Sequence, residues 1–252
     1  MPPTCRPGTA AVAALVIGIA IALALRGVAQ TQLPGGPTDG DAPLLGARLR
    51  VWYRALLSPL ENLLVEWNVH ADALTYSQLV VSVLAGVAFW KGWIFLAGWL
   101  TILAGTLDVL DGGVARQGGT SGPRGALVDS LADRYAEFAT FFGLGAFFRD
   151  SWVLGAVALA CFGSFMVSYT RARAEGLGLG MKVGSVQRPE RYVILGFGGW
   201  LDGLVSHLTC SFLDRTAHVV LTAAVVVLAA LSTWTAWQRA RHAARNLGEA
   251  AG

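Results

Sequence analysis

Four aspartates form two pairs at helical spacing in a stretch that is otherwise mostly apolar. Asp108 and Asp111 are three positions apart, and Asp129 and Asp133 are four apart, so each pair shares one face of a helix. Ionisable side chains at membrane depth are costly unless they are paired, hydrated or bound to metal. Carboxylates directed at one point repel one another unless cations lie between them, and hard oxygen ligands favour Mg²⁺, Mn²⁺ or Ca²⁺ over Zn²⁺. The pattern predicts one or two Mg²⁺ or Mn²⁺ ions beside a phosphorylated substrate.

The residues between the two pairs suit a ligand that carries phosphate. Gly112 and Gly113, with Ala115 close behind, remove side-chain bulk where a nucleotide could approach the backbone. Arg116 offers a guanidinium fork that matches phosphate oxygens. A glycine-rich loop then ends the helix, and Gly125 begins the next one. We therefore expect a nucleotide site beside the carboxylates.

The spacing from Asp108 to Asp133 reads D-x2-D-G-x2-A-R-x8-G-x3-D-x3-D. It resembles the signature of the CDP-alcohol phosphotransferase (CDP-alcohol phosphatidyltransferase) family at every fixed position. The resemblance implies a homodimeric membrane enzyme with six core helices and two divalent metal ions. Such enzymes displace CMP from a CDP-linked lipid, such as CDP-diacylglycerol, with the hydroxyl of a small alcohol.

The resemblance also assigns roles residue by residue. It implies that the metals are held by Asp108, Asp111, Asp129 and Asp133, and that the cytidine diphosphate is held by Gly112, Ala115, Arg116 and Gly125. Asp133 is the expected catalytic residue, either as a metal ligand or as the general base toward the attacking hydroxyl. An acidic patch in a water-filled channel, or a set of hydrogen bonds between helices, is the structural alternative.

A cluster of basic residues further along the chain bears on the identity of the acceptor alcohol. Residues 168–175 and 187–191 resemble the branch of the family that makes phosphatidylinositol phosphate from inositol 1-phosphate, although that branch is expected to have lysine in place of Arg171. A phosphorylated acceptor needs fixed guanidinium groups near the metals, and we assign Arg171, Arg173 and Arg191 to its phosphate. The alternatives are glycerol 3-phosphate, an unphosphorylated alcohol, or a basic loop that only sets topology or touches anionic lipid.

The elements that must position these residues are expected to be membrane helices. The chain has 252 residues, of which 54% are hydrophobic and 14% charged, and its mean hydropathy is +0.54. An all-α integral membrane protein is predicted, with a six-helix transmembrane core within residues 70–240 and no nucleic-acid partner. Hydropathy places the spans at about 73–90, 92–112, 125–147, 152–172, 191–209 and 216–237.

Further segments flank this core. Residues 1–30 contain an apolar run that predicts an extra N-terminal transmembrane helix or a signal-like segment, and residues 31–43 read as a linker. Residues 44–67 show the period of an amphipathic helix, which lies either in the membrane interface or against the core. Residues 241–252 are expected to form a cytoplasmic tail.

The distribution of charge predicts the orientation. Most of the 19 Lys and Arg residues lie before the first core span, in the 116–124 loop, in the 171–191 loop and near the C-terminus. The positive-inside rule then puts the aspartates on the cytoplasmic side of a membrane, for which a prokaryotic inner membrane is expected. This orientation favours a retained first helix over a cleaved signal.

Two other functions compete with lipid transfer. A membrane prenyltransferase rich in aspartate also uses Mg²⁺ and a diphosphate, but it gives no reason for the glycine and arginine spacing. A cation transporter would spread its acids through the membrane depth. The cysteines Cys5, Cys161 and Cys210 have no metal-ligand spacing.

Overall fold

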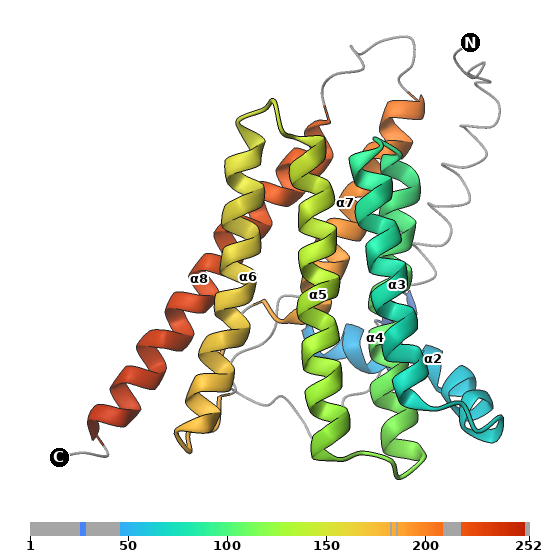
Figure 1. Cartoon of the computed structure of the whole chain (residues 1–252), viewed down its shortest axis with the longest axis vertical. Helices are drawn as coiled ribbons and strands as arrows, with labels where there is room; N and C mark the ends of the chain where they lie inside the picture. The colour runs from blue at the N-terminus through green and yellow to red at the C-terminus, as the bar shows by residue number, and fades with distance from the viewer. Residues whose placement is uncertain (1–25, 29–45, 182, 185, 209–217, 250–252) are drawn as a thin grey trace.

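The computed structural model describes residues 26–28, 46–181, 183–184, 186–208 and 218–249, and every regular element in these ranges is an α-helix. The long helices are α2 (Gly46–Glu66), α3 (Ala71–Trp90), α4 (Ile94–Gln117), α5 (Pro123–Phe147), α6 (Val153–Gly176), α7 (Arg188–Leu208) and α8 (Val219–Glu249). Helices α3 to α8 run along the long axis of the molecule, whereas α2 lies across it (Figure 1). The all-α prediction is confirmed for these residues.

Four helices are long and apolar enough to cross a membrane, namely α3, α4, α6 and α8. The other two helices of the bundle, α5 and α7, carry several of the charged side chains of the site described below. That all six helices span the membrane therefore stays a prediction. The expected N-terminal helix within residues 1–30 and the expected linker at 31–43 lie outside the described residues, except for a helical fragment at 26–28.

Glycines set the close approach of neighbouring helices. A Cβ on Gly143 of α5 would collide with the backbone carbonyl of Gly86 on α3, and a Cβ on Gly98 of α4 would collide with the backbone of Trp200 on α7. Small residues commonly let membrane helices pack this tightly. These contacts hold α3 against α5 and α4 against α7, the four helices that also supply the side chains of the site.

The larger apolar core and the buried charged cluster around the aspartates lie in opposite halves of the bundle. The apolar core lies where α3 and α5 end and where α4, α6 and α8 begin, with Phe89, Leu144 and Leu228 fully buried. The connection between α4 and α5 and the ends of α6 and α8 lie at the opposite end (Figure 1). Most of the buried charged side chains, including Asp111, Asp133, Glu190 and Arg191, lie toward this second end, where the chemistry has to take place.

Several helices extend beyond the predicted spans. Helix α4 ends at Gln117 rather than 112, α6 ends at Gly176 rather than 172, and α8 continues to Glu249, beyond the predicted limit at 237. Hydropathy detects only the apolar part of a helix, whereas i,i+4 pairs such as Arg171 with Glu175 extend α6 into polar surroundings. Residues 241–249 of the expected tail therefore belong to α8.

Candidate active site

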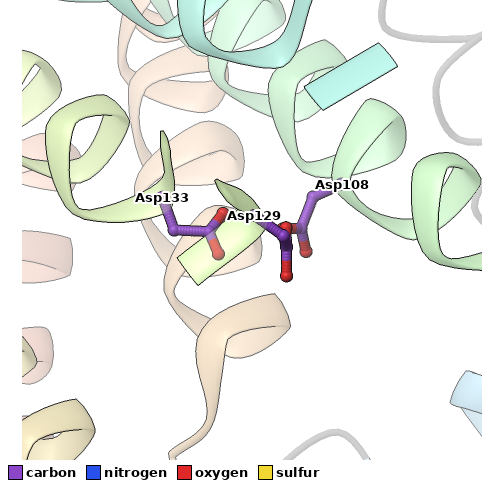
Figure 2. A group of neighbouring side chains, drawn as sticks. All are labelled: Asp108, Asp129 and Asp133. Atoms are coloured by element: carbon purple, nitrogen blue, oxygen red, sulfur yellow. The ribbon is translucent and has the colours of Figure 1, made fainter. Parts of the chain in front are cut away.

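Three of the four predicted aspartates form a compact group. Asp108 comes from the last part of α4, and Asp129 and Asp133 come from the first turns of α5. One carboxylate oxygen from each residue lies within 4.8 Å of the other two, and Figure 2 shows the three carboxyl groups gathered in one place. We call these residues the three-aspartate group. Hard, anionic oxygens at this separation fit a magnesium or manganese ion.

Asp111 lies beside this group but not within it. Its carboxylate is almost fully buried and accepts a hydrogen bond of 2.8 Å from Thr75 Oγ1 on α3. Asp111 lines the same cavity as Asp108 and Asp129. The structure thus brings the four aspartates to one region, and the role of Asp111 as a metal ligand stays a prediction.

Arg188 is the cation that faces the three-aspartate group. Its Nη1 lies 3.2 Å from Asp108 Oδ1 and 3.8 Å from Asp129 Oδ2, and it forms an ion pair with Asp133. Asp133 is only 1% exposed, so this pairing offsets a charge that water barely reaches. Arg188 was not predicted from the sequence, although it is the first residue of the Arg-Pro-Glu-Arg run.

Gln78 fixes the other side of Asp133. This fully buried residue of α3 donates hydrogen bonds of 3.2 Å to Asp133 Oδ1 and 2.7 Å to the hydroxyl oxygen of Tyr192 on α7. Gln78 was not predicted from the sequence either. The feature of the sequence that could have identified Gln78 is an amide side chain within an otherwise apolar span, because a buried amide needs hydrogen-bond partners.

A cavity of about 640 Å³ adjoins the aspartates. All four residues predicted to hold the cytidine diphosphate line it, namely Gly112, Ala115, Arg116 and Gly125. At Gly112, a Cβ would come within 3.1 Å of Arg116 Nη1, so the missing side chain leaves room for the guanidinium. Thr120, Ser121 and Arg124 add polar groups along the α4–α5 connection. The volume and lining suit a nucleotide, while the role of each residue stays a prediction.

The glycine next in the sequence has a different neighbour. A Cβ on Gly113 would collide with the carboxylate of Glu61 on α2, which is nearly buried and accepts a hydrogen bond of 3.0 Å from Gln117. We expected Gly113, like Gly112, to make room for a ligand. In the structure Gly112 faces the cavity and Gly113 accommodates α2.

The three predicted acceptor arginines are placed differently. Arg191 is buried, forms an ion pair with Glu137 and donates a hydrogen bond of 3.1 Å to the carbonyl of Ser164. Arg173 and Arg171 are exposed on the last turns of α6, where Arg171 pairs with Glu175 at 2.8 Å. Only Arg191 is therefore part of the buried network next to the aspartates.

Arg191 borders a second, narrow cavity of about 20 Å³. Asp133, Arg134 and Arg188 also line it, which gives this side of the site three guanidinium groups. Arg134 donates hydrogen bonds of 2.8 Å to Glu137 and 2.6 Å to Ser168. Arg134 was not predicted from the sequence as a residue of the site, although its position directly after Asp133 could have indicated it.

A comparison with protein families now identifies this arrangement. The family model for CDP-alcohol phosphatidyltransferase matches residues 68–240. The chain belongs to the CDP-alcohol phosphatidyltransferase family. It is therefore a phosphotransferase, and the resemblance of the aspartate spacing is confirmed at the level of the family.

Relatives within the CDP-alcohol phosphatidyltransferase family include bacterial and archaeal proteins. An uncharacterised protein of Aquifex aeolicus is 36% identical over 165 residues, which cover 64% of this chain and 84% of the relative. Archaetidylinositol phosphate synthase of Methanothermobacter thermautotrophicus is 35% identical over 67% of this chain and 80% of its own length. Phosphatidylinositol phosphate synthase of Cutibacterium acnes is 32% identical over 58% of this chain and 72% of its own length.

Solved structures of the CDP-alcohol phosphatidyltransferase fold are also similar. Phosphatidylinositol phosphate synthase of Mycobacterium tuberculosis with CDP-DAG bound has a TM-score of 0.63 and 27% identity, over 75% of this chain and 94% of that one. The same enzyme in complex with manganese and citrate has a TM-score of 0.62 and 28% identity, over 73% of this chain and 87% of that one. The bundle described above is thus a known architecture for this family.

Proposed function

We propose that this enzyme transfers the phosphatidyl group of CDP-diacylglycerol to a hydroxyl of inositol 1-phosphate and releases CMP, as a step in phospholipid biosynthesis. One observation carries the proposal: the three-aspartate group lies between two cavities of different character. Asp108 and Asp129 line the large cavity with the predicted nucleotide residues, and Asp133 lines the narrow one with three arginines. A donor and an anionic acceptor can therefore approach the same carboxylates from two sides.

The large cavity is the proposed donor site. Gly112, Ala115 and Gly125 leave the backbone accessible, and Arg116 supplies a cation for the diphosphate. The solved relative that has CDP-DAG bound supports this choice of donor. The acyl chains would extend from the cavity between helices into the bilayer.

Asp108, Asp111, Asp129 and Asp133 would hold two Mg²⁺ or Mn²⁺ ions. When bound, these ions neutralise the diphosphate and make CMP a better leaving group. The manganese complex of the Mycobacterium tuberculosis relative supports a metal here. Asp111 is held by Thr75, whereas the other three proposed ligands lie against Arg188.

Asp133 is the proposed general base. The acceptor oxygen forms a bond to the lipid-linked phosphorus, the bond from that phosphorus to the CMP oxygen breaks, and the hydroxyl proton passes to Asp133. Gln78 and Arg188 contact the two oxygens of this carboxylate and so fix its orientation. Positioning of the hydroxyl contributes strongly to such reactions.

The arginine side of the site supports a phosphorylated acceptor. Arg191 is fixed by Glu137 beside Asp133, and Arg134 and Arg188 surround the same narrow cavity. Arg171 and Arg173 stay proposed contributors to phosphate binding, although they lie exposed at the end of α6 and do not line this cavity. Relatives named phosphatidylinositol phosphate synthase favour inositol 1-phosphate, and glycerol 3-phosphate and an unphosphorylated alcohol are the alternatives.

The proposed location is a prokaryotic inner membrane, with the aspartates facing the cytoplasm. Most of the basic residues lie in α2 and near the helix ends on the side of the aspartates, as the positive-inside rule requires of the cytoplasmic side. We also propose a homodimer, which is an expectation from the family.

The test is CMP release from CDP-diacylglycerol by the purified full chain in detergent with Mg²⁺ or Mn²⁺. Inositol 1-phosphate, glycerol 3-phosphate, free inositol and serine are compared as acceptors. Release with inositol 1-phosphate alone is the expected result. Release with free inositol or serine alone would overturn the acceptor assignment, and turnover of a prenyl diphosphate in place of CDP-diacylglycerol would overturn the proposed reaction.

A further inference from the structure

The start of α7 is held by one residue of α2. Gln187 precedes α7, and Glu190 in its first turn accepts a hydrogen bond of 3.0 Å from the backbone N–H of Gln187. This is one half of a capping box, in which an acid satisfies the N–H of the residue before the helix. Arg50 closes the arrangement, because its Nη1 donates to Gln187 Oε1 at 3.1 Å and its Nη2 forms an ion pair with Glu190.

Glu190 depends on this ion pair because it is fully buried. Removing one partner of a buried pair leaves an uncompensated charge, which is far more damaging than the loss of an exposed pair. Without Arg50, the carboxylate of Glu190 would have to turn toward water. The first turn of α7 would then lose the hydrogen bond that caps it.

Arg188 lies within this capped turn, between Gln187 and Glu190. Its guanidinium reaches all three members of the three-aspartate group from there. The conformation of the first turn of α7 therefore decides whether Arg188 can make these contacts. Arg50, which itself contacts none of the aspartates in the described structure, fixes that conformation.

We infer that Arg50 is a positioning residue, which holds the first turn of α7 and thereby keeps Arg188 against the three-aspartate group. Its effect on turnover rests on the proposed function. The effect of Arg50 on metal binding does not rest on the proposed function, because it follows only from the contacts between Arg188 and the carboxylates.

Other contacts of α2 allow this role to be isolated. Tyr53 and Thr106 of α4 share a hydrogen bond of 2.7 Å, and Glu61 accepts one from Gln117. These contacts tie α2 to α4 and do not involve α7. Loss of Arg50 should therefore release the start of α7 while α2 stays docked. Tyr53→Phe is the matched control, because it removes a polar contact of the same helix with α4.

The direction of the effect on metal affinity separates positioning from general damage. A guanidinium paired with carboxylates competes with a cation for the same oxygens. Releasing Arg188 should therefore tighten Mn²⁺ binding by roughly three- to tenfold, a small part of the Coulomb attraction between charges this close. Turnover should fall by about tenfold, because the substrate phosphates lose a cation fixed in position. A loosened or partly unfolded site would bind Mn²⁺ more weakly.

The experiment titrates Mn²⁺ into the purified full chain without substrate and follows free Mn²⁺ by electron paramagnetic resonance, with CMP release measured in parallel. Arg50→Ala should bind Mn²⁺ more tightly and turn over more slowly, whereas Tyr53→Phe should match the wild type. The double variant Arg50→Ala/Arg188→Ala should have the Mn²⁺ affinity of Arg188→Ala alone, because the first residue acts through the second. Unchanged or weaker binding in Arg50→Ala, or additive effects in the double variant, would overturn the inference.

If Arg50→Ala does not yield a monodisperse protein, Arg50→Lys decides the question. Lysine can neutralise Glu190 but cannot also bond Gln187 with a planar fork, so a smaller shift in the same direction is expected. Wild-type affinity in this variant would overturn the inference. A wild type that releases no CMP with any acceptor would reject the proposed function, while the Mn²⁺ titration would still test the role of Arg50.

Discussion

Arg188 Nη1 lies 3.2 Å from Asp108 Oδ1, although the two residues are 80 positions apart in the sequence. The contact joins the first residue of α7 to the last part of α4, and the same nitrogen also pairs with Asp133 of α5. The charged groups of the site therefore come from three helices, and α3 adds Thr75 and Gln78. Its net charge depends on an arginine as well as on the acids, so substitutions of either kind should change how it binds a metal or a phosphate.

Asp129→Asn should lower CMP release by roughly a hundredfold or more, because it removes a charged ligand from the proposed metal site. The fold should persist, since Asp129 is partly exposed and an amide has nearly the same shape. Specific activity and thermal unfolding in detergent are the measurements. Asp150→Asn is the control, because its exposed carboxylate pairs only with exposed Arg149 in the described structure. Wild-type activity in Asp129→Asn would contradict the metal assignment.

Chelation of divalent ions should abolish CMP release, and Mn²⁺ or Mg²⁺ should restore it. Added Mn²⁺ should also raise the unfolding temperature, because a ligand at a hundred times its Kd stabilises the native state by about 2.7 kcal/mol. A thermal scan with and without Mn²⁺ checks this without any substrate. The same shift in the Asp129→Asn variant would mean that the ion binds elsewhere.

Arg191→Lys should raise the KM for a phosphorylated acceptor by about tenfold and change the KM for the CDP-lipid much less. Lysine keeps the charge beside Glu137 but loses the planar fork that suits phosphate. Initial rates with each substrate varied in turn provide both constants. Arg149→Lys, an exposed exchange in the α5–α6 connection, serves as the control. A change confined to the CDP-lipid would assign Arg191 to the donor site instead.

Gly143→Ala should destabilise the bundle by about 1–3 kcal/mol, because the new methyl group would overlap the carbonyl of Gly86 and force α3 and α5 apart. Gly155→Ala is the matched control, since a Cβ there has no neighbour within 4 Å. Alanine favours a helix over glycine, so this second variant should be as stable as the wild type or slightly more so. Equal unfolding temperatures for the two variants would refute the close α3–α5 contact.

The sequence predicted the parts of the molecule that depend on local patterns. The spacing of Asp108 and Asp111 and of Asp129 and Asp133 located the site, because each pair lies within one helix. Hydropathy located the helices, because apolar runs long enough to cross a bilayer are typical of membrane helices. The amphipathic helix expected at 44–67 is α2, which covers Gly46–Glu66.

Features that depend on long-range contacts escaped prediction. Gln78 contacts Asp133 across 55 positions and Arg188 contacts Asp108 across 80, and no periodicity links residues so far apart. Arg171 and Arg191 look equivalent in a basic loop, yet one is exposed and the other buried. The predicted ends of the helices differ from the observed ones because a polar turn can remain helical after the apolar run has ended.

The contacts of α2 bear on where the working unit of this chain begins. The match to the family starts at residue 68, whereas α2 ends at Glu66. Glu61 nevertheless occupies the space beside Gly113, and Arg50 neutralises buried Glu190. A chain shortened to the matched segment would keep every aspartate of the site and lose both of these side chains. A truncated version made for expression should therefore start before α2, because the boundary of similarity is not the boundary of the stable protein.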